Sequence, residues 1–370
     1  MRIEAAVVNK AGSPFTLETL ELEEPRNDEI RVRIVAVGLC HTDVAFQHGV
    51  LPFANPFVLG HEGAGVVEAV GSEVDLVQPG DRVAISFRSC GECQNCEAGL
   101  PAYCHSMPML NYAGMRPDGT TSLSRDGKVI QSNFFGQSSF ASHCLTYERN
   151  VVKLPDDLPF EIACPLGCGV QTGAGSILKS MDCRPGSPLL ITGGGTVGLS
   201  AVMAAKIRGC DPVIIIEPQE SRRELALELG ATHAIDPRTM PDLASAVRAI
   251  VPIGVAYAFD TTGRPDVLTA VMDCLAPKGL FGIVGIPPGG TPVPGDLNQV
   301  ITLGHRIMGI IEGDADPASF LPELIAHHRN GRLPVERLIR TYPLTQINRA
   351  IEEQHSGVCV KPVLLTGQTG

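Results

Sequence analysis

The chain has 370 residues, 44% of them apolar, and a formal net charge of −11 at pH 7. This length and apolar content predict two domains with substantial cores, and the negative charge argues against nucleic acid as a partner, which requires a basic face. No apolar run reaches the ~18 residues that a membrane-spanning helix needs. Because the opening segment Met1–Val8 lacks signal-peptide features, we expect a cytoplasmic protein whose twelve cysteines are reduced thiols or metal ligands.

The pattern of the chain changes along its length. Up to about residue 170, short alternating segments punctuated by Gly and Pro predict β-strands, for example at 31–37, 65–71 and 81–85. From Pro188 onward, apolar runs alternate with helical periods, which predicts a parallel, doubly wound sheet. Its expected elements are strands at 188–192, 213–217, 255–260 and 279–285 and helices at 197–209 and 220–230, and a last strand is expected at 358–365.

Four cysteines lie close together at Cys90, Cys93, Cys96 and Cys104. Thiolates on a tight loop can face a common centre, and the fourth completes a tetrahedron, as in a closed structural zinc site. Disulfides are disfavoured because the first three cysteines are too close in sequence to pair well. An iron–sulfur cluster is a second alternative, but the long last gap and the lack of Pro after Cys104 fit the compact ferredoxin run poorly. The sequence therefore predicts a structural zinc lobe at about 88–106.

A glycine pattern, Gly193-x-Gly195-x-x-Gly198, follows a predicted strand and opens a helix. These glycines permit a tight turn, backbone approach to a pyrophosphate and close helix–strand packing, with the phosphates at the helix N-terminus. A tight turn without a ligand is the alternative. Glu217 ends the next strand, where a carboxylate takes the ribose hydroxyls and repels a 2′-phosphate, so NAD is favoured over NADP. Arg222 and its neighbour Arg223 are either solvated charges or an edge of the ribose pocket.

Three further potential metal ligands, Cys40, His61 and Cys168, lie far from one another in the sequence. Two thiolates and one imidazole can form a catalytic zinc site whose fourth position is open. Each residue also has an ordinary reading, as a buried cysteine or a hydrogen-bonded core histidine, and spacing alone does not decide between the two.

The stretch from Gly60-His61-Glu62 through Gly65 and Gly71 to Val74 is similar to the signature of zinc-containing medium-chain alcohol dehydrogenases. The cysteine lobe and the glycine turn fall in that family's order, and the resemblance covers essentially the whole chain. It is sharper toward bacterial aryl-alcohol (benzyl alcohol) and geraniol dehydrogenases. The segments that carry this closer resemblance are 134–140, 147–150, 165–175, 217–218 and 312–317.

The resemblance implies a fold and two kinds of cofactor. It implies an α/β protein with a GroES-like, β-rich catalytic domain at 1–170, a Rossmann NAD-binding domain at 171–312, and a return to the catalytic domain at 313–370. It also implies two zinc ions per chain, one held by Cys40, His61 and Cys168 and one by the four-cysteine lobe. A homodimer or homotetramer is expected by the same analogy.

The resemblance also implies roles for single residues. Asp43 would orient the His61 ring, Glu62 would lie behind the zinc, and Thr42 would take the substrate proton. The expected cofactor-binding residues are His41, Thr172, Gly193, Gly195, Thr196, Val197, Gly198, Glu217, Arg222, Val284 and Lys361. For His41 and Lys361, a solvated cation is the alternative reading.

The proton route departs from that of many relatives, which carry a His where this chain has Ala45. The proton would leave through ribose and water or through His48, for which a surface position is the alternative. Five aromatic residues are expected to line an apolar substrate pocket, with core packing as the alternative: Phe53, Phe57, Phe87, Phe134 and Phe135.

The sequence thus predicts an NAD- and zinc-dependent oxidation of aromatic or allylic primary alcohols, of the benzyl, cinnamyl or geraniol type, to aldehydes. Zinc supplies the chemistry by lowering the pKa of a bound hydroxyl. The alternatives are an S-(hydroxymethyl)glutathione (formaldehyde) dehydrogenase, a broad-range alcohol dehydrogenase, and a protein that binds zinc and nucleotide without catalysis.

Overall fold

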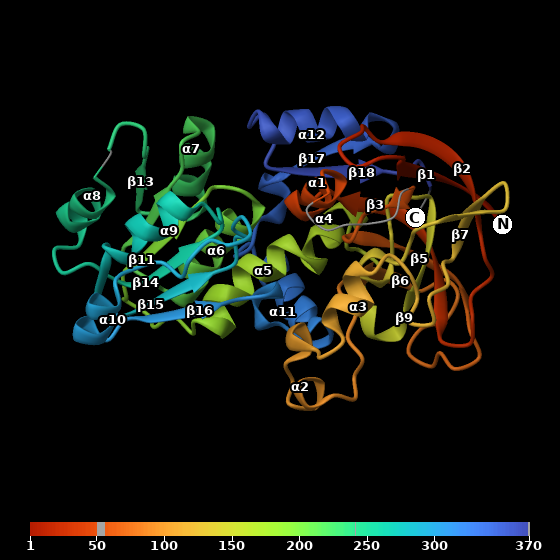
Figure 1. The fold of residues 1–370 in the computed structure, drawn as a ribbon, viewed down its shortest axis with the longest axis horizontal. Coiled ribbons are helices and arrows are strands. Elements are labelled where there is room, and N and C mark those ends of the chain that lie inside the picture. The colour runs from red at the N-terminus through yellow and green to blue at the C-terminus, as the bar shows by residue number, and fades with distance from the viewer. Residues whose placement is uncertain (50–55, 241, 369–370) are drawn as a thin grey trace. The chain divides into compact units, whose positions relative to one another are not determined.

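The computed structural model describes residues 1–49, 56–240 and 242–368 (Figure 1). The chain divides into two compact units. Unit 1 comprises Met1–Cys168, Asp316–Ile325 and Val335–Gly370, and unit 2 comprises Gly169–Ala315 and Ala326–Pro334. Within the described residues, no helix combines the length and the apolarity needed to cross a membrane.

Unit 1 consists mainly of β-strands. They are β1 (Arg2–Val8), β2 (Thr16–Leu22), β3 (Glu29–Gly38), β4 (Phe57–Val58), β5 (Gly63–Val70), β6 (Arg82–Ile85), β7 (Leu123–Arg125), β8 (Lys128–Ile130), β9 (His143–Tyr147), β10 (Val151–Lys153), β17 (Ile339–Pro343) and β18 (Lys361–Leu365). One sheet has the order β4-β1-β2-β7-β8, and the other has the order β10-β6-β5-β3-β18-β17 with β9 also paired to β3. The last strand therefore lies beside an early one, with Val363 of β18 opposite Gly38 of β3.

The helices of unit 1 are short. They are α1 (His41–Gln47), α2 (Gln94–Glu97), α3 (Met107–Tyr112), α4 (Phe160–Ala163) and α12 (Ile347–His355), while α11 (Pro317–Arg329) contains the division between the units.

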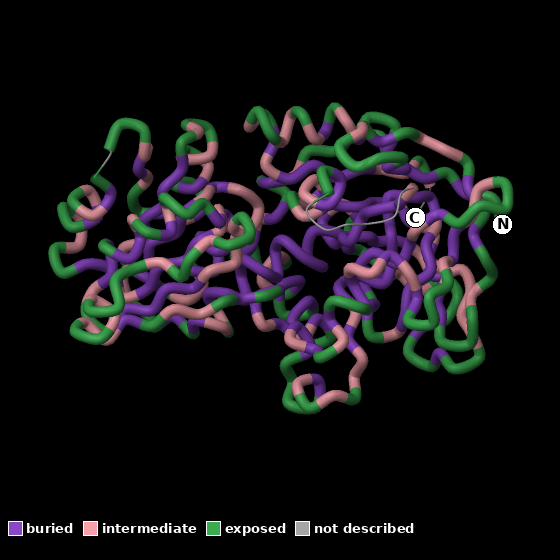
Figure 2. Tube along the Cα trace, in the orientation of Figure 1, coloured by how far each residue is buried: buried purple, intermediate pink, exposed green. Residues whose placement is uncertain are grey.

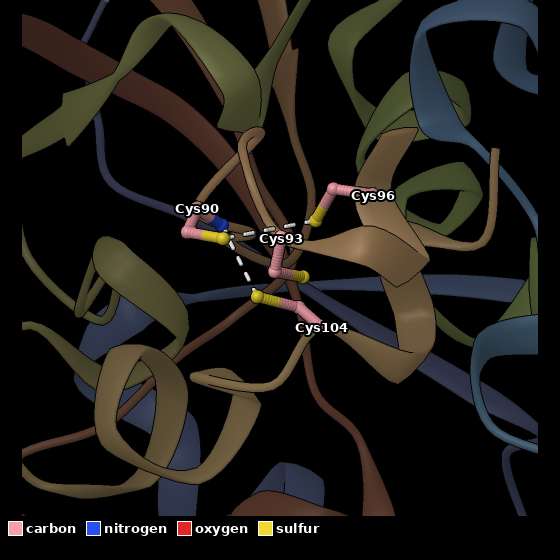
Figure 3. A group of neighbouring side chains, drawn as sticks. All are labelled: Cys90, Cys93, Cys96 and Cys104. Carbon is pink, nitrogen blue, oxygen red and sulfur yellow. Dashed lines mark hydrogen bonds between the residues drawn. The ribbon is translucent and has the colours of Figure 1, made fainter. Parts of the chain in front are cut away.

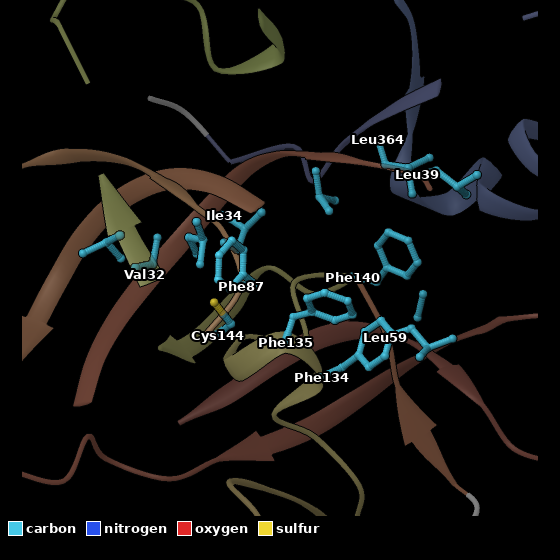
Figure 4. Packing of buried hydrophobic residues seen from close by; sticks show 14 of the residues in the cluster. Val32, Ile34, Leu39, Leu59, Phe87, Phe134, Phe135, Phe140, Cys144 and Leu364 are labelled. Atoms are coloured by element: carbon cyan, nitrogen blue, oxygen red, sulfur yellow. The ribbon is translucent and has the colours of Figure 1, made fainter. Parts of the chain in front are cut away.

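The main core of unit 1 packs inward-facing residues of β3 and β5 against a group of phenylalanines, drawn in part in Figure 4. Val32 and Ile34 of β3 are fully buried, and so is Phe140. Close strand pairing explains one glycine of the signature: a Cβ at Gly65 would lie 2.0 Å from the carbonyl oxygen of Arg33 on β3. Glycine is therefore required there by strand packing, whether or not a ligand is bound.

Unit 2 confirms the predicted parallel, doubly wound sheet. Its strands are β11 (Leu189–Thr192), β12 (Val213–Ile216), β13 (His233–Ile235), β14 (Val255–Asp260), β15 (Leu275–Ile283) and β16 (Arg306–Gly309). Their order is β13-β12-β11-β14-β15-β16, with all neighbours parallel. The helices are α5 (Gly169–Gly175), α6 (Thr196–Arg208), α7 (Glu220–Leu229), α8 (Leu243–Ile250), α9 (Pro265–Met272) and α10 (Leu297–Leu303).

The central strands of this sheet are those that the sequence predicts. All residues of β11 and β12 are buried, so both strands appear in the sequence as apolar runs. Figure 2 shows buried chain through the middle of unit 2 and exposed chain at its rim. The edge strands β13 and β16 are missing from the prediction because only one residue of β13 and none of β16 is buried. The sheet order reverses at β11, which is where such folds bind a ligand at the carboxyl ends of the strands.

Candidate metal centres and nucleotide site

The four cysteines of the predicted lobe converge in the structure. The sulfur atoms of Cys90, Cys93, Cys96 and Cys104 all lie within 4.8 Å of one another, and Cys90 Sγ is 3.9 Å from Cys96 Sγ (Figure 3). At that distance the two sulfurs are not bonded to each other. Two cysteines are half-buried and two are buried. The donor set and its convergence fit a closed tetrahedral zinc site.

Backbone amides support negative charge on these sulfurs. The amides of Cys90 and Ser106 donate to Cys104 Sγ at 3.3 and 3.4 Å, and the His105 amide donates to Cys93 Sγ at 3.5 Å. The His105 contact is the main cause that lowers the pKa of Cys93 to about 6. Burial instead raises the pKa of Cys104 to about 12. The lobe therefore favours ionisation of Cys93 over that of Cys104, and a metal cation would favour ionisation of all four thiols.

A second group brings together Cys40, His61, Glu62 and Cys168, whose ligand atoms lie within 4.8 Å of one another. Cys40 is the N-cap of α1. His61 and Glu62 directly precede β5, and Cys168 follows the helical turn at Cys164–Gly167. His61 and Glu62 are fully buried. Residue 60 must be glycine here, because its φ is +94° and a Cβ would lie 2.3 Å from the Phe140 nitrogen.

Asp43 fixes the orientation of this second group. Its Oδ1 accepts hydrogen bonds from His61 Nδ1 at 2.9 Å and from the Gly60 amide at 3.1 Å, and its Oδ2 accepts from the Cys40 amide at 3.0 Å. His61 Nε2 is buried and has no hydrogen-bond partner within the described residues. With Nδ1 protonated toward Asp43, release of the Nε2 proton on metal binding would expose the lone pair that a metal ligand needs. The residues present therefore fit a zinc ion.

Neighbouring side chains stabilise the charged forms of Cys40 and His61. A hydrogen bond with Cys168 is the main cause that lowers the pKa of Cys40 well below its ordinary value, and His61 adds to this effect. Burial would lower the pKa of His61, but the charge and hydrogen bond of Asp43 raise that pKa well above its ordinary value. The site therefore favours a thiolate at Cys40, which is the ionisation state that binds a metal.

Glu62 forms an ion pair with Lys361, and both side chains are buried. Lys361 Nζ also donates to the Leu39 carbonyl oxygen at 3.0 Å. Burial opposes the charge of Lys361, but Glu62 raises the pKa of the ammonium above its ordinary value. A Cβ at Gly38 would lie 1.8 Å from Glu62 Oε2, so glycine makes room for the pair. The expected contact of Lys361 with a cofactor phosphate stays a prediction.

The polar residues of α1 lie at different depths. A hydrogen-bond contact of 3.7 Å joins the Thr42 hydroxyl to Cys40 Sγ, which places Thr42 beside the group. His41 is exposed at the first position of the helix. His48 is also exposed and its ring Nδ1 contacts the Val44 carbonyl oxygen at 2.8 Å, so its described hydrogen bond stays within its own helix.

Four of the five predicted pocket residues are core residues in the structure. Phe57, Phe87, Phe134 and Phe135 are each at most 4% exposed. The Phe135 ring stacks on His61 with a centroid distance of 4.5 Å, and the Phe134 ring meets His61 edge-on at 5.5 Å. Phe57 touches Phe134. These contacts hold the imidazole in place, while contact with a substrate stays a prediction. Phe53 lies outside the described residues.

The glycine turn after β11 has the geometry of a phosphate cradle. Gly193 has a φ of +94°, and a Cβ at Gly198 would lie 1.8 Å from the Gly193 carbonyl oxygen. Gly195 is the N-cap residue of α6, and no side chain caps the helix there. Nothing lies within 4 Å of the position that a Cβ of Gly195 would occupy. Thr196 and Val197 form the first turn of that helix. An open backbone at a helix N-terminus fits an anionic ligand.

Glu217, directly after β12, closes one side of this turn. Its Oε2 accepts from the Gly194 amide at 2.6 Å and its Oε1 from the Gln219 amide at 2.8 Å. Arg223 donates to the carbonyl oxygens of Glu217 and Pro218 at 2.9 and 2.7 Å and pairs with Asp236 at 3.3 Å. Arg222 is half-buried on α7.

The other predicted cofactor residues lie elsewhere at the carboxyl edge of unit 2. Thr172 is buried on α5, and its hydroxyl donates to Glu312 Oε2 at 3.4 Å. Val284 follows β15 and its amide donates to the Asp260 carbonyl oxygen at 3.0 Å.

Sequence reasoning missed two buried polar residues that organise these sites. The Asp260 carboxylate accepts from the Thr192 hydroxyl at 2.5 Å and from the Gly263 amide at 2.8 Å, which ties the turns after β11 and β14 together. Gln137 donates to the His61 carbonyl oxygen at 2.9 Å and accepts from the Gly63 amide at 3.0 Å. Gln137 lies in the segment 134–140 that carries the family resemblance, and Asp260 ends a predicted strand, but neither signal indicates the distant partners of these side chains.

Comparison with known proteins agrees with this geometry. Residues 26–156 match the alcohol dehydrogenase GroES-like domain, and residues 196–326 match the zinc-binding dehydrogenase family. The chain belongs to the zinc-dependent alcohol dehydrogenase family. The resemblance seen in the sequence is thereby confirmed, as are the GroES-like and Rossmann-type folds of the two parts and the assignment as an enzyme.

Three relatives of this dehydrogenase cover nearly all of it. A geraniol dehydrogenase of Castellaniella defragrans is 46% identical over 363 residues, which span 98% of this chain and 97% of the relative. The crystal structure of an alcohol dehydrogenase zinc-binding domain protein from Burkholderia ambifaria has a TM-score of 0.97 at 45% identity and full coverage of both chains. That of benzyl alcohol dehydrogenase from Acinetobacter calcoaceticus has a TM-score of 0.95 at 39% identity, covering 99% of each.

Proposed function

We propose that this alcohol dehydrogenase uses NAD and two zinc ions to oxidise aromatic or allylic primary alcohols to aldehydes. Cys40, His61 and Cys168 would hold the catalytic zinc, and the four-cysteine lobe would hold the structural one. The observation that carries the proposal is the buried Nε2 of His61, which has no hydrogen-bond partner within the described residues while its Nδ1 is committed to Asp43. A bound zinc would lower the pKa of the alcohol hydroxyl, and the deprotonated alcohol would then give up hydride from its carbon to the nicotinamide ring of NAD.

The preference for NAD rests on charge at the end of β12. The carboxylate of Glu217 is held against the glycine turn, where it can accept the adenosine ribose hydroxyls and would repel a 2′-phosphate. Two arginines near it have other partners, since Arg223 and Arg238 both pair with Asp236, at 3.3 and 2.6 Å. Their charge is thus partly compensated, which further disfavours NADP.

The substrate class rests on the aromatic residues and on the relatives. The phenylalanines around His61 present an apolar, planar environment, and relatives over nearly the whole chain are a geraniol and a benzyl alcohol dehydrogenase. Contact of the bound alcohol with these rings would favour benzyl, cinnamyl or geranyl alcohol over ethanol, because burial of additional apolar area stabilises the bound state.

Thr42 would receive the proton of the substrate hydroxyl, because its own hydroxyl lies beside Cys40. Ala45 cannot carry this proton onward. His48 lies on the exposed side of the same helix, so ribose and water form the favoured route and His48 the second.

Initial rates with benzyl, cinnamyl, geranyl and ethyl alcohols and with S-(hydroxymethyl)glutathione, each with NAD and NADP, test the proposal. We expect the highest kcat/KM with one of the first three alcohols and NAD, and metal analysis should give two zinc ions per chain. Turnover of the glutathione adduct without benzyl alcohol oxidation would contradict the substrate class. Glu217→Ala should reduce the preference for NAD over NADP, whereas Glu220→Ala, on the next helix, should not.

The proposal includes a cytoplasmic homodimer or homotetramer with small-molecule substrates. Light scattering of the purified protein would measure its oligomeric state.

A further inference from the structure

The three proposed ligands of the catalytic zinc come from three separate segments of unit 1. Asp43 ties two of these segments together, because the described hydrogen bonds of its carboxylate go to Cys40, Gly60 and His61. The position of Cys168 relative to His61 therefore depends on other contacts.

Ser86 holds the turn that precedes Cys168. It directly follows β6 and is fully buried, and its hydroxyl donates to the Gly167 carbonyl oxygen at 2.6 Å. A Cβ at Gly167 would lie 2.4 Å from the Ile85 carbonyl oxygen, so the backbone of the turn lies directly against the end of β6. These contacts fix the residue immediately before Cys168.

Gln137 connects Ser86 with His61. Its Nε2 donates to the carbonyl oxygens of His61 at 2.9 Å and of Ser86 at 3.2 Å, and its Oε1 accepts from the Gly63 amide at 3.0 Å. The two donor hydrogens and the oxygen of the amide are thus all engaged. Because Gln137 is buried, rotation of its amide would leave buried polar groups unpaired, which disfavours any other orientation.

The loop that carries Gln137 has an unusual backbone conformation. Asn133, Phe135 and Ser138 have φ values of +66°, +51° and +58°, which residues other than glycine seldom adopt. The Ser138 hydroxyl donates to the Val58 carbonyl oxygen at 2.7 Å and so ties the loop to β4. Residues in such conformations are concentrated at functional sites, which agrees with a specific task for the side chain that this loop presents.

We propose that Gln137 and Ser86 are positioning residues that set the spacing between His61 and Cys168 and thereby the zinc affinity of the second group, an inference that rests on the proposed function. Neither side chain would touch the metal, because they act through the carbonyl oxygens of His61 and Gly167. Ligands that are already in place lose less conformational freedom when a metal binds, so the site binds it more tightly.

Competition with a chelator tests this proposal by measuring the affinity of each zinc ion in the full chain. Ser86→Ala and Gln137→Met, which retains a long side chain without the amide, should each weaken the binding of one ion by about tenfold. The ion of the four-cysteine lobe should be unaffected. The visible spectrum of the cobalt-substituted protein identifies the weakened site, because two sulfurs with one imidazole absorb differently from four sulfurs.

Ser139→Ala is the matched control for both variants. It removes a buried hydroxyl two residues from Gln137, and this hydroxyl has no hydrogen-bond partner within the described residues. Both zinc affinities should stay unchanged in this variant.

The double variant of Ser86→Ala and Gln137→Met tests whether the two residues act as one connection. Its zinc affinity should be about as low as that of either single variant, because loss of either side chain breaks the same chain of contacts. Effects that multiply would show two independent packing contributions and would overturn the inference.

The outcomes separate this inference from the proposed function. Selective weakening of the ion in the second group supports the inference. Unchanged affinity in both single variants, or equal weakening of both ions, would overturn it, and Ser86→Ala decides alone if Gln137→Met does not fold. If the unsubstituted protein binds only the ion of the lobe, the proposed catalytic zinc is wrong and the inference fails with it.

Discussion

The lobe at Cys90–Cys104 gathers four sulfurs from one short stretch of chain, whereas the second candidate centre takes its side chains from positions as distant as 40 and 168. In the lobe, backbone amides are the described donors to the sulfurs, and two of the cysteines are half-buried. In the second centre, a buried carboxylate orients a buried imidazole, and a buried ion pair lies beside them. A local loop can therefore assemble a candidate metal site by itself, but the dispersed candidate site depends on the fold around it.

This difference predicts that substitutions in the two centres affect different properties of the protein. Loss of a lobe ligand should affect folding, because metal binding at such a site contributes to folding. Loss of a ligand from the dispersed centre should affect chemistry, because a packed core holds that site in place.

Cys168→Ala gives the largest expected effect. Removal of one of the three proposed ligands should lower kcat by about 10³-fold or more, because zinc provides several kcal/mol of stabilisation to the reaction. Zinc content should fall from two ions per chain to one, with an unchanged circular dichroism spectrum. Cys164→Ala, which removes a buried thiol four residues away, should keep both ions. Full activity of Cys168→Ala would eliminate the proposed ligand set.

Cys96→Ala tests the lobe. We expect loss of one zinc ion and a stability decrease of several kcal/mol in urea denaturation, because the metal would no longer offset the cost of ordering the loop. Protease cleavage within the lobe should increase. Cys144→Ala removes a buried sulfur outside both centres and should retain two ions. A Cys96→Ala protein with unchanged stability would show that the lobe needs no metal.

Asp43→Ala tests whether the dispersed centre depends on its surroundings. Loss of the carboxylate that holds His61 should reduce zinc affinity or kcat by about 10–100-fold. Chelator competition measures the affinity of the second ion, while the lobe ion should exchange as it does in the unsubstituted protein. Equal release of both ions would contradict the distinction drawn between the two centres.

Alkaline pH should produce the smallest effect, a loss of folding stability. The group expected to ionise is Tyr147, whose hydroxyl contacts the loop that carries Phe135. The Tyr147 hydroxyl shares its single hydrogen between Glu29 Oε1 at 3.2 Å and Asn133 Oδ1 at 3.3 Å, and burial raises the pKa of Tyr147 to about 12. An unfolded tyrosine ionises near pH 10. The stabilisation is therefore complete below about pH 10 and is lost as pH rises toward about 12, by about 1–3 kcal/mol.

Urea denaturation at several pH values between 8 and 11 measures this loss. Tyr147→Phe should be less stable at neutral pH by about 1 kcal/mol, since two buried acceptors lose a donor, but should lose less stability above pH 10. Parallel losses in the two proteins would exclude Tyr147 as the titrating group.

Several features could be predicted from the sequence because they depend on neighbouring residues. The central strands of unit 2, its glycine turn and the four-cysteine lobe are of this kind. The edge strands β13 and β16 could not be predicted, because partial exposure removes the apolar signal on which strand prediction depends. Asp260 and Gln137 were missed for a related reason, since their partners are distant in sequence.

The amino-acid sequence by itself determined the sheet class of unit 2, the spacing of the lobe and the family to which the chain belongs. Only the tertiary structure decided that Cys40, His61 and Cys168 meet, that Asp43 holds His61 through Nδ1, that Lys361 pairs with Glu62, and that the phenylalanines are buried around His61. The physical reason is that local motifs are set by short-range backbone geometry. Contacts between distant residues exist only once strands such as β3, β5 and β18 have paired and formed the core.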